Sequence, residues 1–179
     1  GGVFSEYLDR RLEVGHRLDL TGPFGVFTLR DNPDARLVFV GGGAGMAPIL
    51  ALLRSMAERG IDRPATFYYG ARTRPDLCFE EELRSLEQTL PRFRYVPALS
   101  EHAGEQKWDG EVGLITDVVR RNEPALSGAD AYVCGPPPMV EAAIPLLETL
   151  GVMTKHVYYD KFTTTGDAGD SNVLEAESR

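Results

Sequence analysis

Short apolar runs alternate with helical patterns along most of the chain, and this alternation limits the possible fold more than any other feature. The runs are nearly continuous in β-branched and aromatic residues, as in strands that are covered on both faces. Strands and helices in this order form parallel sheets with right-handed crossovers. The sequence therefore predicts an α/β fold with a doubly wound, five-stranded parallel sheet. The predicted strands are Leu37–Val40, Ala65–Tyr69, Phe93–Ala98, Ala131–Cys134 and His156–Tyr159, and the predicted helices lie near Ala47–Arg59, Glu80–Leu90, Asp117–Asn122 and Met139–Leu150.

The two ends of the chain have a different character. A short helix is predicted at Ser5–Leu12, and short strands are predicted at His16–Leu20 and Val26–Leu29. This is too little chain to close a core of its own, so we interpret residues 1–35 as the end of a preceding β domain. Residues 36–162 then form the α/β domain, and the polar residues 163–179 form a disordered tail. Because the chain opens without Met, we expect it to be a piece of a longer polypeptide.

Charge and cysteine content exclude several classes of function. The 179 residues include 19 basic and 27 acidic side chains, a net charge of −8. Such a chain is a poor ligand for nucleic acid or an anionic membrane, and no apolar run approaches the roughly 20 residues that span a bilayer. Two cysteines, Cys78 and Cys134, supply neither a disulfide framework nor a four-cysteine metal site. We therefore expect a cytoplasmic protein without membrane insertion, nucleic-acid partner or metal ligands of its own.

A glycine-rich loop, Gly41-Gly42-Gly43-Ala44-Gly45-Met46-Ala47-Pro48, links the first predicted strand to the first helix. Glycines in this position let backbone approach a ligand closely, and the helix N-terminus presents N–H groups that suit a pyrophosphate. The spacing is Gly-x-Gly-x-x-Pro instead of the usual dinucleotide fingerprint, and no acidic residue ends the second strand. The alternative is a tight βα turn without a ligand. If the loop binds pyrophosphate, Gly45→Val should weaken binding and leave the fold intact.

A second loop, Cys134-Gly135-Pro136-Pro137-Pro138-Met139, follows the fourth predicted strand. Ligands of doubly wound sheets lie at the carboxyl ends of strands, where this loop begins. Its three prolines make it rigid, so it would suit a wall that positions a planar ring. The alternative is a buried cysteine that behaves as a small apolar residue.

Together these loops resemble those of the ferredoxin–NADP reductase superfamily, and specifically the flavin- and NAD-binding reductase components of multicomponent oxygenases. The resemblance extends to about Phe162. Its motifs are Gly2–Ser5, Gly22–Gly25, Gly41–Pro48, Tyr69–Arg72, Trp108–Gly113, Cys134–Met139 and Asp160–Phe162.

The resemblance implies that NADH passes hydride to FAD, and that electrons then leave for an oxygenase or ferredoxin acceptor. It assigns Cys134 to setting the transfer distance and Phe162 to covering the flavin ring, although Phe162 could equally be a packing residue. The residues implied for NAD are Gly41, Gly42, Gly43, Ala44, Gly45, Met46 and Pro48 at the pyrophosphate and Gly135, Pro136, Pro137 and Met139 at the nicotinamide. The residues implied for the FAD pyrophosphate are Gly2, Val3, Phe4 and Ser5.

Arg72 and Arg74 could contact the adenosine ribose or a phosphate. Arginine after the second strand can signal NADP, but the run that contains them looks like that of NADH-dependent oxygenase reductases, so we expect NADH rather than NADPH. The flavin-holding segment of the family is absent, so FAD would bind firmly only in the intact protein. A 2Fe-2S cluster would need a domain outside this chain. Alternatives are a cytochrome reductase, the reductase part of a flavohaemoglobin, and a noncatalytic nucleotide-binding module.

Overall fold

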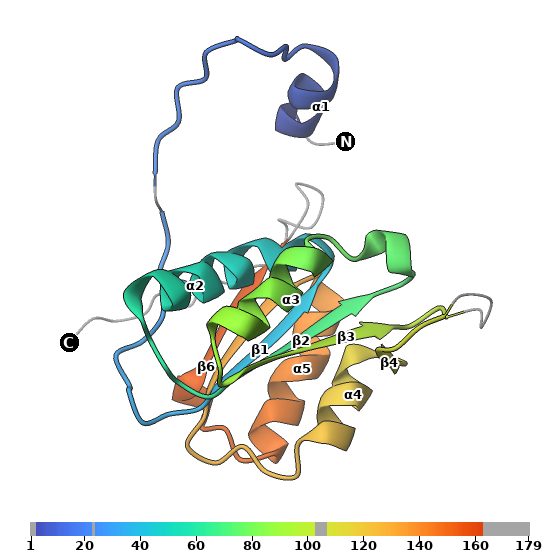
Figure 1. Cartoon of the computed structure of the whole chain (residues 1–179). Helices are drawn as coiled ribbons and strands as arrows, with labels where there is room; N and C mark the ends of the chain where they lie inside the picture. Colours follow the sequence, from blue (N-terminus) through green and yellow to red (C-terminus); the bar gives the residue numbers. More distant parts are fainter. Residues whose placement is uncertain (1–2, 23, 103–106, 163–179) are drawn as a thin grey trace.

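The computed structural model describes residues 3–22, 24–102 and 107–162. Six parallel strands form one twisted sheet in the order β4-β3-β2-β1-β5-β6 (Figure 1). All five predicted strands are confirmed, but the sheet has one strand more than predicted. The strand that was not predicted, β4, contains two residues, which is too short to produce a recognisable pattern. The strands are β1 (Leu37–Gly42), β2 (Ala65–Ala71), β3 (Phe93–Leu99), β4 (Glu111–Val112), β5 (Asp130–Gly135) and β6 (Val157–Lys161).

Helices cover both faces of this sheet, which confirms the doubly wound architecture (Figure 1). Alternate residues of each strand point to opposite faces, so β1 contributes Phe39 to one apolar core and Val40 to the other. The helices α2 (Met46–Arg59) and α3 (Glu80–Thr89) cover the first core, and α4 (Ile115–Asn122) and α5 (Pro137–Thr149) cover the second. Short 3₁₀ turns are η1 (Gly43–Gly45), η2 (Arg74–Asp76) and η3 (Thr154–His156).

The N-terminal residues contain one helix, α1 (Val3–Arg10), and extend away from the sheet (Figure 1). This helix confirms the prediction at Ser5–Leu12, displaced by two residues. The strands predicted at His16–Leu20 and Val26–Leu29 are wrong, because neither segment is paired in the described part of the chain. Strands are stable only where their backbone groups find a partner. That residues 1–35 end a flavin-binding domain therefore stays a prediction, and residues 163–179 lie outside the described residues.

Buried charged groups gather at the N-terminal ends of the strands. Asp130 has no exposed surface and pairs with Arg63, which is 7% exposed, at 2.8 Å. Glu123, also buried, accepts hydrogen bonds from Arg36 and from the hydroxyl of Tyr68. Buried charges are tolerated only when they are paired and hydrogen-bonded, as these are.

No helix of the described residues is long and apolar enough to cross a membrane.

Candidate functional site

A groove of about 570 Å³ opens at the opposite edge of the sheet, where the strands have their carboxyl ends. This volume lies in the usual range for small-molecule sites. Its floor is formed by the ends of β1 and β2, and its walls by the first residues of α4 and α5. Apolar side chains such as Leu114 and Met139 provide much of the lining. Such a groove at the carboxyl ends of parallel strands is where a doubly wound sheet binds its ligand.

The glycine loop contributes two of its predicted residues, Gly42 and Gly43, to this lining. The other residues of this loop that were predicted to bind a nucleotide do not line the groove. They are Gly41, Gly45 and Met46, which are buried, and Ala44 and Pro48.

Residue 45 must be a glycine because its protein neighbours leave no room for a side chain, and not because a ligand needs the space. A Cβ atom there would lie 2.6 Å from Cα of Gly135 and closer still to the carbonyl group of Cys134. A side chain at residue 45 would therefore push against β5 and not into the groove. The expectation that Gly45→Val would leave the fold intact is wrong for this reason.

Gly43 is the glycine that faces open space. It has a φ of +53°, in the left-handed region, and a Cβ there would meet no atom within 4 Å. It lies just before α2, whose N-cap residue Gly45 makes no side-chain capping hydrogen bond. The N-cap of α4, Leu114, makes none either and also lines the groove. Two helix N-termini without side-chain caps give a partial positive charge that suits a pyrophosphate.

The cysteine loop forms an apolar wall. Pro136 and Met139, which were predicted, line the groove, and so does Pro138, which was not. Pro137 begins α5, and Gly135 is buried at the end of β5. Proline has no backbone N–H group, so the first turn of α5 has fewer donors for an anion than those of α2 and α4. This wall suits an uncharged ring better than a phosphate.

Cys134 and Phe162 lie at the same end of the sheet, but neither lines the groove. Cys134 is fully buried, and burial, with a smaller effect of Asp160, raises the pKa of its thiol to about 12. The thiol is therefore protonated at neutral pH and is not an activated nucleophile. Phe162 donates its backbone N–H to the carbonyl oxygen of Gly135 at 3.2 Å, and the residue is 42% exposed. Both predicted residues thus adjoin Gly135, Cys134 as its neighbour in the chain and Phe162 through this hydrogen bond.

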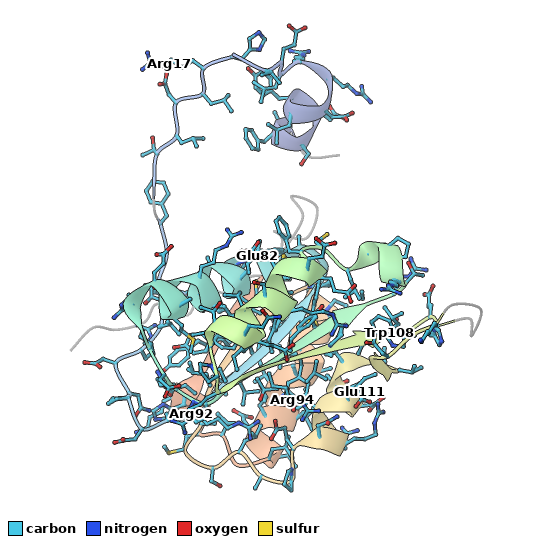
Figure 2. All side chains as sticks on the ribbon, in the orientation of Figure 1. Arg17, Glu82, Arg92, Arg94, Trp108 and Glu111 are labelled. Atoms are coloured by element: carbon cyan, nitrogen blue, oxygen red, sulfur yellow. The ribbon has the colours of Figure 1, made fainter. Side chains whose placement is uncertain are left out.

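The two predicted arginines point to different places. Arg72 lines the groove, and its guanidinium group makes a bidentate pair with the carboxylate of Glu101, at 2.8 and 3.1 Å. Arg74 lies outside the groove, beside the ring of Trp108 at 5.9 Å (Figure 2 labels Trp108). Asp76 orders the turn between them, since its carboxylate accepts hydrogen bonds from the backbone and hydroxyl of Thr73, which lower its pKa.

Helix α1, which carries three of the residues predicted for FAD, lies apart from the sheet in Figure 1. Val3, Phe4 and Ser5 are exposed in the first turn of α1, and Gly2 lies outside the described residues. Over residues 3–22, 24–102 and 107–162, no group of three His, Cys, Asp or Glu side chains is placed to hold a metal ion.

The start of α4 was not predicted as part of the site. Gly113, Leu114 and Thr116 line the groove, as does Gly70 at the end of β2. A glycine just before a helix is the available signal, and Gly113 has a φ of +116°. The predicted helix began two residues too late, at Asp117, which left this helix N-terminus out of the predicted site.

Comparisons with known proteins agree with this arrangement. The family model described as "Oxidoreductase NAD-binding domain" matches residues 39–144. The reductase component of propane 2-monooxygenase from Mycolicibacterium goodii is 48% identical over 167 residues, which cover 92% of this chain and 48% of that protein. The reductase component of phenol 2-monooxygenase from Pseudomonas is 34% identical, covering 96% of this chain and 49% of that protein. The chain thus spans about half the length of these relatives.

A solved structure is also similar over most of the chain. The cytochrome P450 reductase from Amycolatopsis superposes with a TM-score of 0.80 at 30% identity, covering 89% of this chain and 48% of that one.

Proposed function

Because this chain belongs to the oxidoreductase NAD-binding domain family, we propose that it is the nucleotide-binding part of a flavin-dependent reductase that serves an oxygenase. The observation that carries this proposal is the groove at the carboxyl ends of the strands, where two helix N-termini without side-chain caps meet an apolar wall. When bound, a reduced nicotinamide supplies a hydride, which is two electrons and one proton, from its C4 to N5 of a flavin.

The pyrophosphate would bind at Gly43, between the N-termini of α2 and α4. Backbone N–H groups there would provide the partial positive charge that the pyrophosphate needs. The charged side chains of the described lining are Arg72 and Asp76, and Arg72 is already paired with Glu101. The open space beside Gly43 lets a phosphate oxygen approach the backbone.

The nicotinamide ring would lie toward the cysteine loop, against Pro136 and Met139. Cys134 would act by packing, because its buried, protonated thiol has the size to hold the loop but lacks the reactivity of a nucleophile. We assign Phe162, which is hydrogen-bonded to Gly135, to covering the flavin ring. Both roles are positional, since hydride transfer needs no general base.

The adenosine end would lie near Arg72 and Glu101, and this pair supports NADH rather than NADPH. Glu101 neutralises the guanidinium group that could otherwise bind a 2′-phosphate, and its own carboxylate would repel that phosphate. An acidic side chain near the ribose is also the usual acceptor for the 2′-hydroxyl of NAD. Arg74, beside Trp108, is not placed to replace Arg72.

The proposed flavin and electron acceptor would involve more than the nucleotide groove. We assign FAD to the intact reductase, with residues 2–5 at its pyrophosphate and residues 1–35 as the end of its flavin domain. The named relatives support an oxygenase as electron acceptor. A ferredoxin is the alternative acceptor, and a 2Fe-2S cluster would be carried by another domain. We place the protein in the cytoplasm.

Isothermal titration with NADH and NADPH tests the nucleotide assignment. We expect the parent chain to bind NADH at least about tenfold more tightly, which corresponds to about 1.4 kcal/mol. Glu101→Gln should strengthen NADPH binding by a similar factor, because it frees Arg72. Glu82→Gln is a matched control, because Glu82 makes the same kind of bidentate pair with Arg54 between α3 and α2. Neither Glu82, which Figure 2 labels, nor Arg54 lines the groove. Equal affinities for the two nucleotides in the parent would refute the assignment.

Stopped-flow reduction of the flavin-loaded reductase by NADH tests the reaction. Flavin reduction is expected. A protein that binds NADH and FAD but does not reduce the flavin would instead be a noncatalytic nucleotide-binding module.

A further inference from the structure

Residues 27–35, which we call the strap, connect the N-terminal residues to β1 and are held against the sheet by residues far away in sequence. The rings of Phe27 and of Tyr132 in β5 are nearly perpendicular, with centroids 5.6 Å apart. The hydroxyl of Tyr132 accepts the backbone N–H of Arg30 at 2.9 Å. The Arg30 guanidinium group lies 4.8 Å from the ring centre of Tyr158 in β6. The first half of the strap is therefore fixed to two neighbouring strands.

The second half of the strap is held by a buried ion pair. Arg63 donates to the carbonyl oxygens of Ala35 and Arg30, at 2.8 and 3.2 Å, and to Asp130 at 2.8 Å. The other carboxylate oxygen of Asp130 accepts a hydrogen bond from the side chain of Asn32 at 3.3 Å. Nδ1 of His156 lies 2.8 Å from that same oxygen.

The strap makes more contacts with the sheet than a simple connecting segment needs. Loops usually run over the surface with few fixed contacts. Here the strap carbonyls satisfy donors of Arg63, which is 7% exposed, and Asn32 satisfies an acceptor of Asp130, which is fully buried. If the strap moved away, a buried pair would lose hydrogen bonds, which is costly. The ion pair and the strap therefore hold each other in place.

We propose that Arg63, Asp130 and Tyr132 anchor the strap so that the flavin-binding part N-terminal to it is held in register with the nucleotide groove. This inference rests on the proposed function. Arg63 and Asp130 lie at the N-terminal ends of the strands, and neither they nor Tyr132 line the groove, so we treat all three as positioning residues. Their importance follows from the geometry of hydride transfer, in which a displacement of about 1 Å can cost a factor of about 100 in rate.

Tyr132→Phe tests the anchor with little risk to folding, because it removes the hydroxyl that accepts the Arg30 N–H and keeps the aromatic ring. Asn32→Ala is a second variant, which removes the bond to Asp130. Tyr159→Phe is the matched control, since Tyr159 lies in β6, is half-exposed and has Lys161 beside its ring. Hydrogen–deuterium exchange of this chain should show the strap amides exchanging about fivefold faster in the first two variants and unchanged in the control. Unchanged exchange in all three would overturn the anchor.

Flavin reduction in the flavin-loaded reductase tests the positioning role. At saturating NADH we expect Tyr132→Phe to slow flavin reduction about tenfold while the Kd for NADH stays within about twofold of the parent. A faster-exchanging strap with an unchanged reduction rate would overturn the positioning role. A parent protein that binds NADH but does not reduce flavin would overturn the proposed function, and the positioning role with it. The exchange result would still report on the anchor, so the two failures are distinguishable.

Discussion

Replacing Gly45 by alanine adds one methyl group at the point where the glycine loop packs against the end of β5. The added Cβ would lie 2.6 Å from Cα of Gly135, where ordinary van der Waals contact begins at 3.4 Å, and it would overlap the carbonyl group of Cys134. Both neighbours are backbone, and β5 is hydrogen-bonded between β1 and β6. Neither neighbour can rotate away as a side chain could, so the methyl group must push β5 away from the start of α2.

We expect Gly45→Ala to lower the free energy of unfolding by about 3 kcal/mol or more, at the upper end of the usual cost of overpacking. Gly43→Ala is the matched comparison, two residues away. It meets no atom within 4 Å and is strained only by its φ of +53°. Its cost should be about 1–2 kcal/mol. For a domain of ordinary stability, about 5–15 kcal/mol, the difference between the two variants is readily measured.

Urea denaturation followed by circular dichroism gives both values, and an unchanged m-value would show that the comparison is valid. Titration with NADH completes the test. Gly43→Ala should weaken binding in folded protein, because its methyl group enters the groove, whereas the main effect of Gly45→Ala should be on stability. If the two variants were equally stable, the close packing of Gly45 against β5 would be refuted.

Two further predictions concern buried ionisable groups. At pH 8, iodoacetamide should modify the exposed Cys78 in native protein and leave the buried Cys134 unmodified until the protein unfolds. Mass spectrometry of the digested chain measures both modifications. Rapid labelling of Cys134 in native protein would contradict its burial. Burial also raises the pKa of Cys134 from its ordinary 9.0 to about 12 and raises the pKa values of Tyr68 and Tyr95, so the unfolded chain loses these protons first. Stability should therefore be unaffected by these groups below about pH 8.5 and fall as the pH rises toward 12, seen as a lower urea midpoint at pH 10.5 than at pH 8. A constant midpoint over that range would contradict this prediction.

The sheet was predictable because strands buried on both faces leave nearly continuous apolar runs. The strand boundaries were less predictable where something other than side-chain burial determines them. β1 continues through Gly41 and Gly42, which the runs did not include, because their backbones pair with β2 and, at Gly41, with Cys134 of β5. Glycine carries no apolar side chain that would signal a strand. The strands predicted before residue 30 did not form, because a composition suited to a strand does not supply a neighbouring strand to pair with.

The candidate site was predicted at the level of loops but not of individual contacts. The glycine and cysteine loops could be recognised because each directly follows a strand. The pairing of Arg72 with Glu101 joins the ends of two strands, and the sequence alone gives no sign of it. Likewise, the direction of the missing Cβ at Gly45, toward Cys134, depends on how β1 and β5 lie side by side.

The buried ion pairs and the groove lie at opposite edges of one sheet, and this separation matters for redesigning the protein. Arg63 and Asp130 lie before or at the first residues of strands, whereas Arg72 and Glu101 follow the last residues of theirs. Sites that are well separated and share no partners usually have additive effects on the free energy of unfolding. Substitutions that change nucleotide preference at one edge could therefore be combined with stabilising substitutions at the other, and their effects on the free energy of unfolding should add.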